Sequence, residues 1–154
     1  MKLKILFAVL AAVLIISILP ICSMASAEEL ASDFVGNTDT LIEIKNPVEE
    51  VTSTSGKACV ISAVAANGTT VTLYRFDSAK GTYVKMYADD GKALESVVGA
   101  AGLYAQNIDL TYGSNNILVV AASGDNTETV RLQITLIKSN LIDTIKNIWQ
   151  SIVG

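Results

Sequence analysis

The chain has 154 residues, with 11 lysines and arginines against 15 aspartates and glutamates, and it contains no histidine. Its net charge of −4 argues against nucleic acid as a partner, because basic side chains are what bind a phosphate backbone. The lack of histidine excludes a Ser–His–Asp triad and removes the commonest general base and metal ligand.

The first 27 residues follow the order of a secretory signal peptide. Lys2 and Lys4 give a positive start, an apolar run covers 5–19, and 25–27 reads Ala-Ser-Ala, which matches a cleavage box of small residues. The sequence therefore predicts a signal peptide over 1–27. It also predicts a secreted, extracytoplasmic protein, either released or associated with the cell surface.

Two membrane-bound alternatives are weaker than cleavage after Ala27. The apolar run is short for an uncleaved anchor, because a membrane span needs about 20 apolar residues. Cys22 would carry the lipid of a lipoprotein, but Pro20 and Ile21 stand where a lipobox has small residues.

Cleavage after Ala27 leaves 154 less 27, or 127, residues, enough for one domain with its own core. The loss of Lys2 and Lys4 leaves 9 basic and 15 acidic residues, a net charge of −6, so membrane contact is not expected after cleavage. Cys59 is then the one remaining cysteine, and no internal disulfide can form. We predict that Cys59 is buried and unpaired.

Short alternating segments separated by turn residues predict an all-β fold. Residues 28–40 are acidic and polar and predict a loosely packed arm, and 88–102 is the longest irregular stretch after it. Pro47 places the first strand at a sheet edge or a kink. The predicted strands are 41–45, 51–55, 58–65, 70–77, 82–87, 103–110, 116–122 and 129–138.

Asn67-Gly68 is typical of a β-hairpin turn, because both residues accept a positive φ. The same residues begin an Asn-Gly-Thr glycosylation sequon, but the hairpin already explains them. We therefore predict that 58–65 and 70–77 form a hairpin.

Alternation with a period of two places one set of side chains in a common core. The predicted core consists of Cys59, Ile61, Val71, Leu73, Ile108, Leu110, Ile117, Val119, Ala121, Val130, Leu132, Ile134 and Leu136. Strands of this number and spacing favour a β-sandwich.

Residues 110–121 read Leu-Thr-Tyr-Gly-Ser-Asn-Asn-Ile-Leu-Val-Val-Ala. This segment resembles the L-x-x-G-x-N-x-I-x-V-x-A signature of bacterial immunoglobulin-like domains. Ile61-Ser62 and Val71-Thr72-Leu73 resemble the second and third strands of that family, and Pro47 stands where its first strand kinks. The resemblance covers 41–138 and implies an immunoglobulin-like β-sandwich that acts as a spacer, an adhesive module or an accessory domain. It implies no catalytic residues, and we expect Gly113 and Asn115 to shape the turn before Ile117.

The sequence predicts no enzyme, no catalytic residues, no cofactor and no metal site. A small hydrolase would need a cleft that holds two or more close carboxylates, and no pair stands out. Asp89-Asp90-Gly91 and Asp125-Asn126 offer oxygen ligands that suit Ca²⁺, but they lack EF-hand spacing and are ordinary turn residues. Calcium binding by a loop is left open.

Tyr83, Lys85 and Tyr87 share one face of a predicted strand. Two exposed tyrosines on a flat strand face can stack on a sugar ring, so these residues are a candidate binding surface. The preference of tyrosine for strands explains them as well. A carbohydrate- or cell-wall-binding module is therefore the alternative function.

Segment 139–154 predicts an amphipathic helix. Its proposed docking face is Leu141, Ile145, Ile148 and Trp149. Strand parity leaves a second apolar set on the outer face of the sheet that leads into this helix: Tyr74, Phe76, Leu118, Val120 and Ile137. We expect the helix to fold back and cover that face. The alternatives are that the helix docks on a partner, on a second copy or on a membrane. A membrane is disfavoured because the polar side of the helix carries Lys146 alone, balanced by Asp143.

Together these patterns predict an all-β, immunoglobulin-like β-sandwich with a C-terminal amphipathic helix packed on the outer face of one sheet. Its segments are a signal peptide (1–27), an acidic arm (28–40), the sandwich (41–138) and the helix (139–154). The predicted function is a secreted, non-catalytic interaction or structural module of a bacterium. Its partner would be an unidentified protein or a cell-wall component.

We predict that the exported protein begins at Glu28, because signal peptidase cleaves after a small-residue box. Intact-mass analysis of protein recovered from outside the producing cells measures this start. A species that retains Met1, or one that carries lipid on Cys22, would contradict the prediction.

Overall fold

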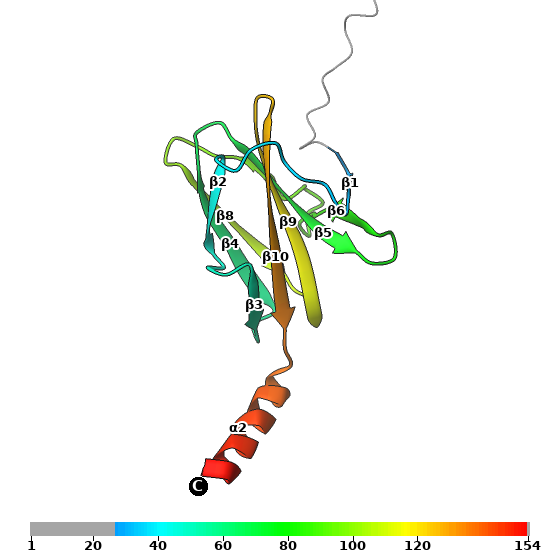
Figure 1. Ribbon diagram of the computed structural model, residues 1–154, viewed down its shortest axis with the longest axis vertical. Coiled ribbons are helices and arrows are strands. Elements are labelled where there is room, and N and C mark those ends of the chain that lie inside the picture. The colour runs from blue at the N-terminus through cyan, green and yellow to red at the C-terminus, as the bar shows by residue number, and fades with distance from the viewer. Residues whose placement is uncertain (1–26, 154) are drawn as a thin grey trace, which may run out of the picture.

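The alternating segments form ten β-strands and a C-terminal helix in the computed structural model, which describes residues 27–153 (Figure 1). The strands are β1 (Glu29–Ala31), β2 (Ile42–Asn46), β3 (Val51–Thr54), β4 (Ala58–Ala65), β5 (Thr70–Asp77), β6 (Thr82–Lys85), β7 (Glu95–Val97), β8 (Leu103–Asp109), β9 (Gly113–Ser123) and β10 (Asn126–Leu136), and the helix is α2 (Ser139–Val153). β1 and β7 lie in segments that the sequence predicts to be irregular. The predicted signal peptide, apart from Ala27, lies outside the described residues.

Two sheets pack face to face, which confirms the all-β sandwich (Figure 1). The larger sheet has the order β1-β6-β5-β9-β10-β3, with β7 also paired to β5, and the smaller sheet has the order β2-β4-β8. β3 runs parallel to β10, whereas the pairs of the smaller sheet are antiparallel. Because β2 and β3 belong to different sheets, the chain crosses between the layers just after Pro47.

The predicted core lies between the two sheets. All of its members belong to one cluster, in which Cys59 and Val130 are partly buried and the others are buried. Ile61, Leu73 and Ile117 have no exposed surface. Period-two alternation therefore identifies the inner face of each strand correctly.

The Asn67-Gly68 turn does not form a β-hairpin, so this prediction is wrong. β4 belongs to the smaller sheet and β5 to the larger one, so the turn carries the chain from one layer to the other. The Thr69 N–H donates to the Ala66 carbonyl at 3.1 Å. Gly68 has a φ of 87° while Asn67 does not have a positive φ, whereas a type I′ hairpin needs positive φ at both central residues.

The sequence predicts that Gly113 and Asn115 shape a turn just before Ile117, but β9 already begins at Gly113, and Asn115 binds the turn that precedes the strand. Its side chain is buried, and its Oδ1 accepts a hydrogen bond from the Thr111 N–H at 2.9 Å. Its Nδ2 donates to the carbonyls of Thr111 and Ile134 at 2.8 and 3.1 Å. Gly113 has a φ of 93°, a conformation that glycine adopts without strain. Asn115 thus satisfies backbone groups that would otherwise be left without partners, which gives it a structural role.

The outer face of the larger sheet carries a second apolar cluster, as strand parity predicts. This outer cluster contains Tyr74, Phe76, Tyr83, Leu118 and Val120. Ile137, which the sequence also places on this face, is not part of the cluster. Leu30 of β1 is 5% exposed and is buried in the same cluster, and Ala27 and Phe34 pack against it. β1 also pairs with β6 and forms one edge of the larger sheet. The arm 28–40 is therefore part of the fold and not a loosely packed tether.

The second half of the arm is fixed to the β9–β10 hairpin. The buried Glu128 carboxylate accepts hydrogen bonds from the N–H groups of Leu41 and Ile42 at 2.6 and 2.9 Å. Asn37 exchanges hydrogen bonds with Thr127, through its backbone N–H at 2.7 Å and its side-chain oxygen at 2.8 Å. Gly36 lies so close that a Cβ there would be 2.1 Å from the Thr127 carbonyl oxygen. The arm is thus held at both of its ends.

α2 does not cover the outer cluster, so the predicted docking of the helix on its own sheet is wrong. The helix leaves the end of β10 and projects away from both sheets (Figure 1). The physical reason is that the arm already buries the apolar side chains of the outer cluster, so they are not exposed for the helix to pack on. The all-β sandwich and the C-terminal helix are confirmed, but their predicted contact is not.

Replacing Leu30 by Ala should lower the free energy of unfolding by about 2–3 kcal/mol, because it leaves a cavity in the outer cluster. Val35→Ala is the matched control in the same arm, since Val35 is 67% exposed. It should change stability by less than about 0.5 kcal/mol. Urea unfolding of the mature chain measures both variants, and equal effects would show that the arm is not packed on the sheet.

Candidate functional site

The predicted binding surface of Tyr83, Lys85 and Tyr87 is not formed. Tyr83 is 6% exposed and Lys85 is 8% exposed, while Tyr87 is 48% exposed. The Tyr83 ring packs edge-on against Phe76, with the ring centroids 5.3 Å apart. Of the two tyrosine rings, only that of Tyr87 is exposed.

Polar groups around Lys85 bind the arm and the neighbouring strands. The Lys85 ammonium lies 3.4 Å from a carboxylate oxygen of Glu95, which also accepts a hydrogen bond from the Thr72 hydroxyl at 3.1 Å. The Tyr87 hydroxyl donates to the Glu28 carboxylate, and this bond is the main cause that raises the pKa of Tyr87. Tyr87 therefore holds the beginning of the arm, whereas Lys85 and Thr72 bind Glu95 of β7.

Tyr74 contacts the residue just before the arm. Its buried hydroxyl donates to the carbonyl of Ala27 at 2.9 Å, a bond that the predicted cleavage after Ala27 removes. Burial is the main cause that raises the pKa of Tyr74, so the phenol stays protonated and keeps its role as a donor. Sequence reasoning assigned Tyr74 to the outer face but gave no signal for this bond, because its acceptor lies far away in the chain.

Two adjoining hollows of about 430 and 320 Å³ share Arg75, Met86 and Tyr87 in their walls. The Arg75 guanidinium donates to the Asp109 carbonyl, and burial lowers the pKa of Arg75. Asp77, on the wall of the larger hollow, accepts from the Ala79 N–H at 2.9 Å. Arg75 and Asp77, two of the charged groups around these hollows, are thus bound to the backbone of the sandwich itself.

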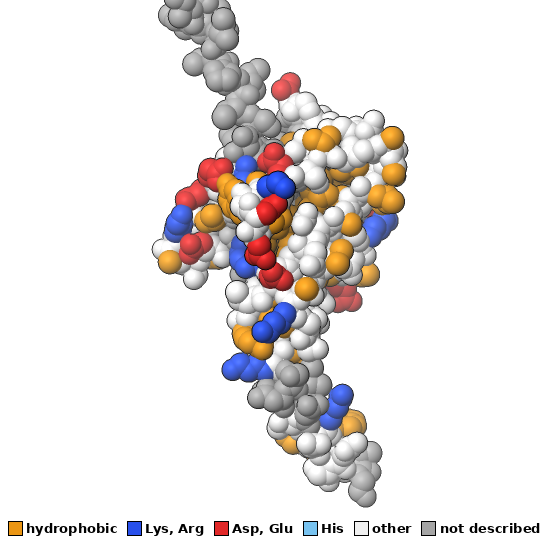
Figure 2. All heavy atoms as spheres, turned by 180° about the vertical axis from the view of Figure 1, so that it is seen from behind, with side chains coloured by type: hydrophobic (Ala, Val, Ile, Leu, Met, Phe, Trp, Pro, Cys, Tyr) orange, Lys and Arg blue, Asp and Glu red, His pale blue; other side chains and the backbone are white. Residues whose placement is uncertain are grey.

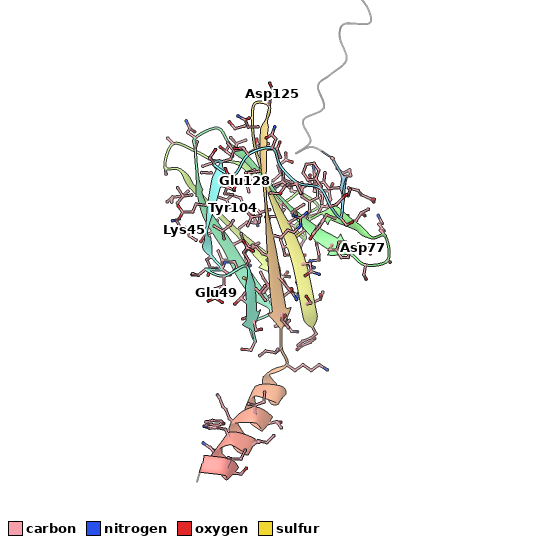
Figure 3. The ribbon with its side chains drawn as sticks, viewed as in Figure 1. Lys45, Glu49, Asp77, Tyr104, Asp125 and Glu128 are labelled. Carbon is pink, nitrogen blue, oxygen red and sulfur yellow. The ribbon has the colours of Figure 1, made fainter. Side chains whose placement is uncertain are left out.

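In the first of the two loops considered for calcium, a carboxylate is used locally. Asp90 forms an ion pair with Lys92 at 2.8 Å, and this contact is the main cause that lowers the pKa of Asp90. Asp125 lies at the tip of the β9–β10 hairpin, at the end of the sandwich opposite α2 (Figure 3). Over the described range 27–153, no three cysteine, aspartate or glutamate side chains group together to hold a metal ion.

Cys59 is unpaired, as predicted, but it is half-buried and not fully buried. It lies near the start of β4, packed against the inner core, with its Sγ 3.8 Å from the Val60 carbonyl oxygen. Burial raises the pKa of the Cys59 thiol. A strand end leaves the side chain less covered than the middle of β4, where Ile61 has no exposed surface.

The apolar face of α2 is exposed. Ile145, Ile148, Trp149 and Ile152 are 58%, 54%, 67% and 72% exposed. Figure 2 shows hydrophobic side chains on the projecting helix, clear of the sandwich. The side chain of Leu141, the fourth predicted docking residue, lies outside the described part of the chain. Within that part, no helix combines the length and apolarity needed to cross a bilayer.

No protein-family model matches the chain, and a search of curated proteins finds no match.

Cys59 should react with a thiol reagent several-fold more slowly in the native protein than in protein unfolded by guanidinium. The reason is that partial burial limits access and reduces the fraction of the reactive thiolate. Spectroscopic labelling rates at one pH measure the difference. Equal rates, or a covalent dimer formed without reductant, would contradict the unpaired and partly buried thiol.

Proposed function

We propose that the mature chain is a secreted, non-catalytic interaction or structural module of the bacterial cell surface or its surroundings. The sandwich acts as a rigid carrier, and α2 acts as the interaction element. Secretion rests on the signal-peptide pattern of the first 27 residues.

The observation that carries this proposal is the exposed apolar face of α2. Four of its large apolar side chains, Ile145, Ile148, Trp149 and Ile152, are each more than half exposed. A large contiguous apolar surface is unusual on a soluble protein that stays monomeric and binds no partner. The outer cluster is already covered by the arm, so the stability of the sandwich does not explain these residues. Their face is available to another molecule.

We also propose that the sandwich is related to bacterial immunoglobulin-like domains. Gly113 and Asn115 of the signature segment shape the turn before β9 through the hydrogen bonds described above. The chain crosses between the sheets after Pro47, at the place where that family kinks its first strand. Spacer and adhesive roles in that family agree with an interaction module.

A carbohydrate-binding module is less well supported. That alternative depends on two exposed, coplanar tyrosines, and Tyr83 is buried against Phe76. Tyr87 alone offers an exposed ring on this part of β6 and its continuation.

Trp149 is the one tryptophan of the chain, so its fluorescence reports on α2 alone. We expect its emission to shift to the blue, and its quenching by acrylamide to fall, with at least one of four probes. The probes are phosphatidylcholine vesicles, vesicles with phosphatidylglycerol, purified peptidoglycan, and the protein itself at rising concentration. Burial of the indole in an apolar contact is the physical reason.

Ile145→Asp should abolish this shift, whereas Gln150→Asp adds the same charge on the polar side and should preserve it. If no probe changes the emission of the parent protein, α2 is not an interaction element.

A further inference from the structure

We propose that α2 is a homodimerisation element, in which the helices of two copies pair in antiparallel directions through their apolar faces. This inference rests on the proposed function, because it names what covers the same face. Three observations support a second copy as the occupant: the exposure of the face, the spacing of its residues and the distribution of charge.

The two apolar clusters of the sandwich are already covered, so neither can cover the exposed face of α2. The arm occupies the outer cluster, where Leu118 and Val120 have no exposed surface, and the inner core is closed between the two sheets. α2 also points away from both layers (Figure 1). Since a helix of 15 residues is marginal on its own in water, it gains most from a contact with another molecule.

The spacing of the apolar residues suits a contact between two such helices. Leu141, Ile145, Ile148 and Ile152 are separated by four, three and four positions, which is the spacing of a seam between paired helices. This order is the same when read from either end of the helix. In an antiparallel pair, Ile145 therefore faces Ile148 of the second copy, and position 141 lies in register with position 152. Trp149 lies beside the seam, where the pair covers part of its ring.

The charge of the mature chain favours the antiparallel arrangement. Residues 28–138 contain 8 basic and 14 acidic residues, a net charge of −6, whereas 139–154 contains only Lys146 and Asp143 and is neutral. Parallel helices would hold two acidic sandwiches side by side. Antiparallel helices place them at opposite ends of a segment about 22 Å long, well beyond the screening length of about 8 Å at physiological salt.

A lipid surface fits these charges less well. An anionic bilayer repels a sandwich of charge −6, and the polar side of α2 has a single lysine to offset this repulsion. The α2 helix of a second copy is uncharged overall, and its apolar residues have the same spacing. An antiparallel pair is also closed by its two-fold axis, so it gives discrete dimers and not fibres. The two sandwiches of such a dimer point in opposite directions, which suits a bridging role.

Sedimentation velocity and light scattering of the mature chain, from below one micromolar to hundreds of micromolar, test the dimer. We expect the mass to double with rising concentration, together with a blue shift of Trp149. Ile148→Ser should keep the protein monomeric over the whole range, because it places a hydroxyl in the centre of the seam. Asn147→Ser, one position away on the polar side, is the matched control and should dimerise like the parent.

Small-angle X-ray scattering of the dimer tests the direction of the helices. The antiparallel pair should be elongated, with its two sandwiches at opposite ends, and raising the salt concentration should change its affinity little. Two sandwiches side by side, or a dimer that survives Ile148→Ser, would overturn the proposal.

A protein that stays monomeric over the whole concentration range also overturns it. In that case, a blue shift of Trp149 with vesicles or peptidoglycan would still support α2 as an interaction element, with lipid or cell wall in place of a second copy. No shift with any probe would overturn both the dimer and the proposed function.

Discussion

The constraint on which the rest of the structure depends is that the larger sheet is apolar on both faces. Along β9, residues 117–121 are buried one after another, so neither side of this strand can face water. The smaller sheet covers one side, and the other side needs a cover of its own. β1 and the residues after it supply that cover, with Leu30 entering the outer cluster. Burying about five large apolar side chains in this way contributes roughly 1.5–3 kcal/mol each before entropic costs.

The cover on the outer face also decides which parts of the chain are free for other tasks. The sequence suggests Lys85 and Tyr87 as ligand-binding residues, but Lys85 pairs with Glu95 of β7, and Tyr87 binds Glu28 of the arm. Glu128, a buried carboxylate, accepts two backbone N–H groups at the junction between the arm and β2. Polar side chains near the arm thus serve the fold, and α2 is left as an apolar element without a structural task in the sandwich.

Local patterns predict the strands and their inner faces because alternation is a property of the strand itself. Ile61, Val71 and Ile117 are therefore placed correctly, and so are Leu118 and Val120 on the opposite face. The pairing of segments is different, because it depends on distant residues. Asn67-Gly68 predicts a change of direction but not the sheet that receives β5. Leu30, in a polar and acidic segment, gives no periodic signal that it enters the outer cluster, and this is why the sequence assigns that cover to α2.

The independence of α2 from the sandwich links its folding to its contacts. A helix of 15 residues that touches no core is only marginally stable in water, so an occupant of its apolar face stabilises the helix as well as the complex. Part of the contact energy is then used to order the helix, which weakens the apparent affinity. The sandwich, whose two apolar faces are covered by the smaller sheet and the arm, stays folded whether or not α2 is occupied. Association can therefore respond to local protein concentration without any change in the stability of the carrier.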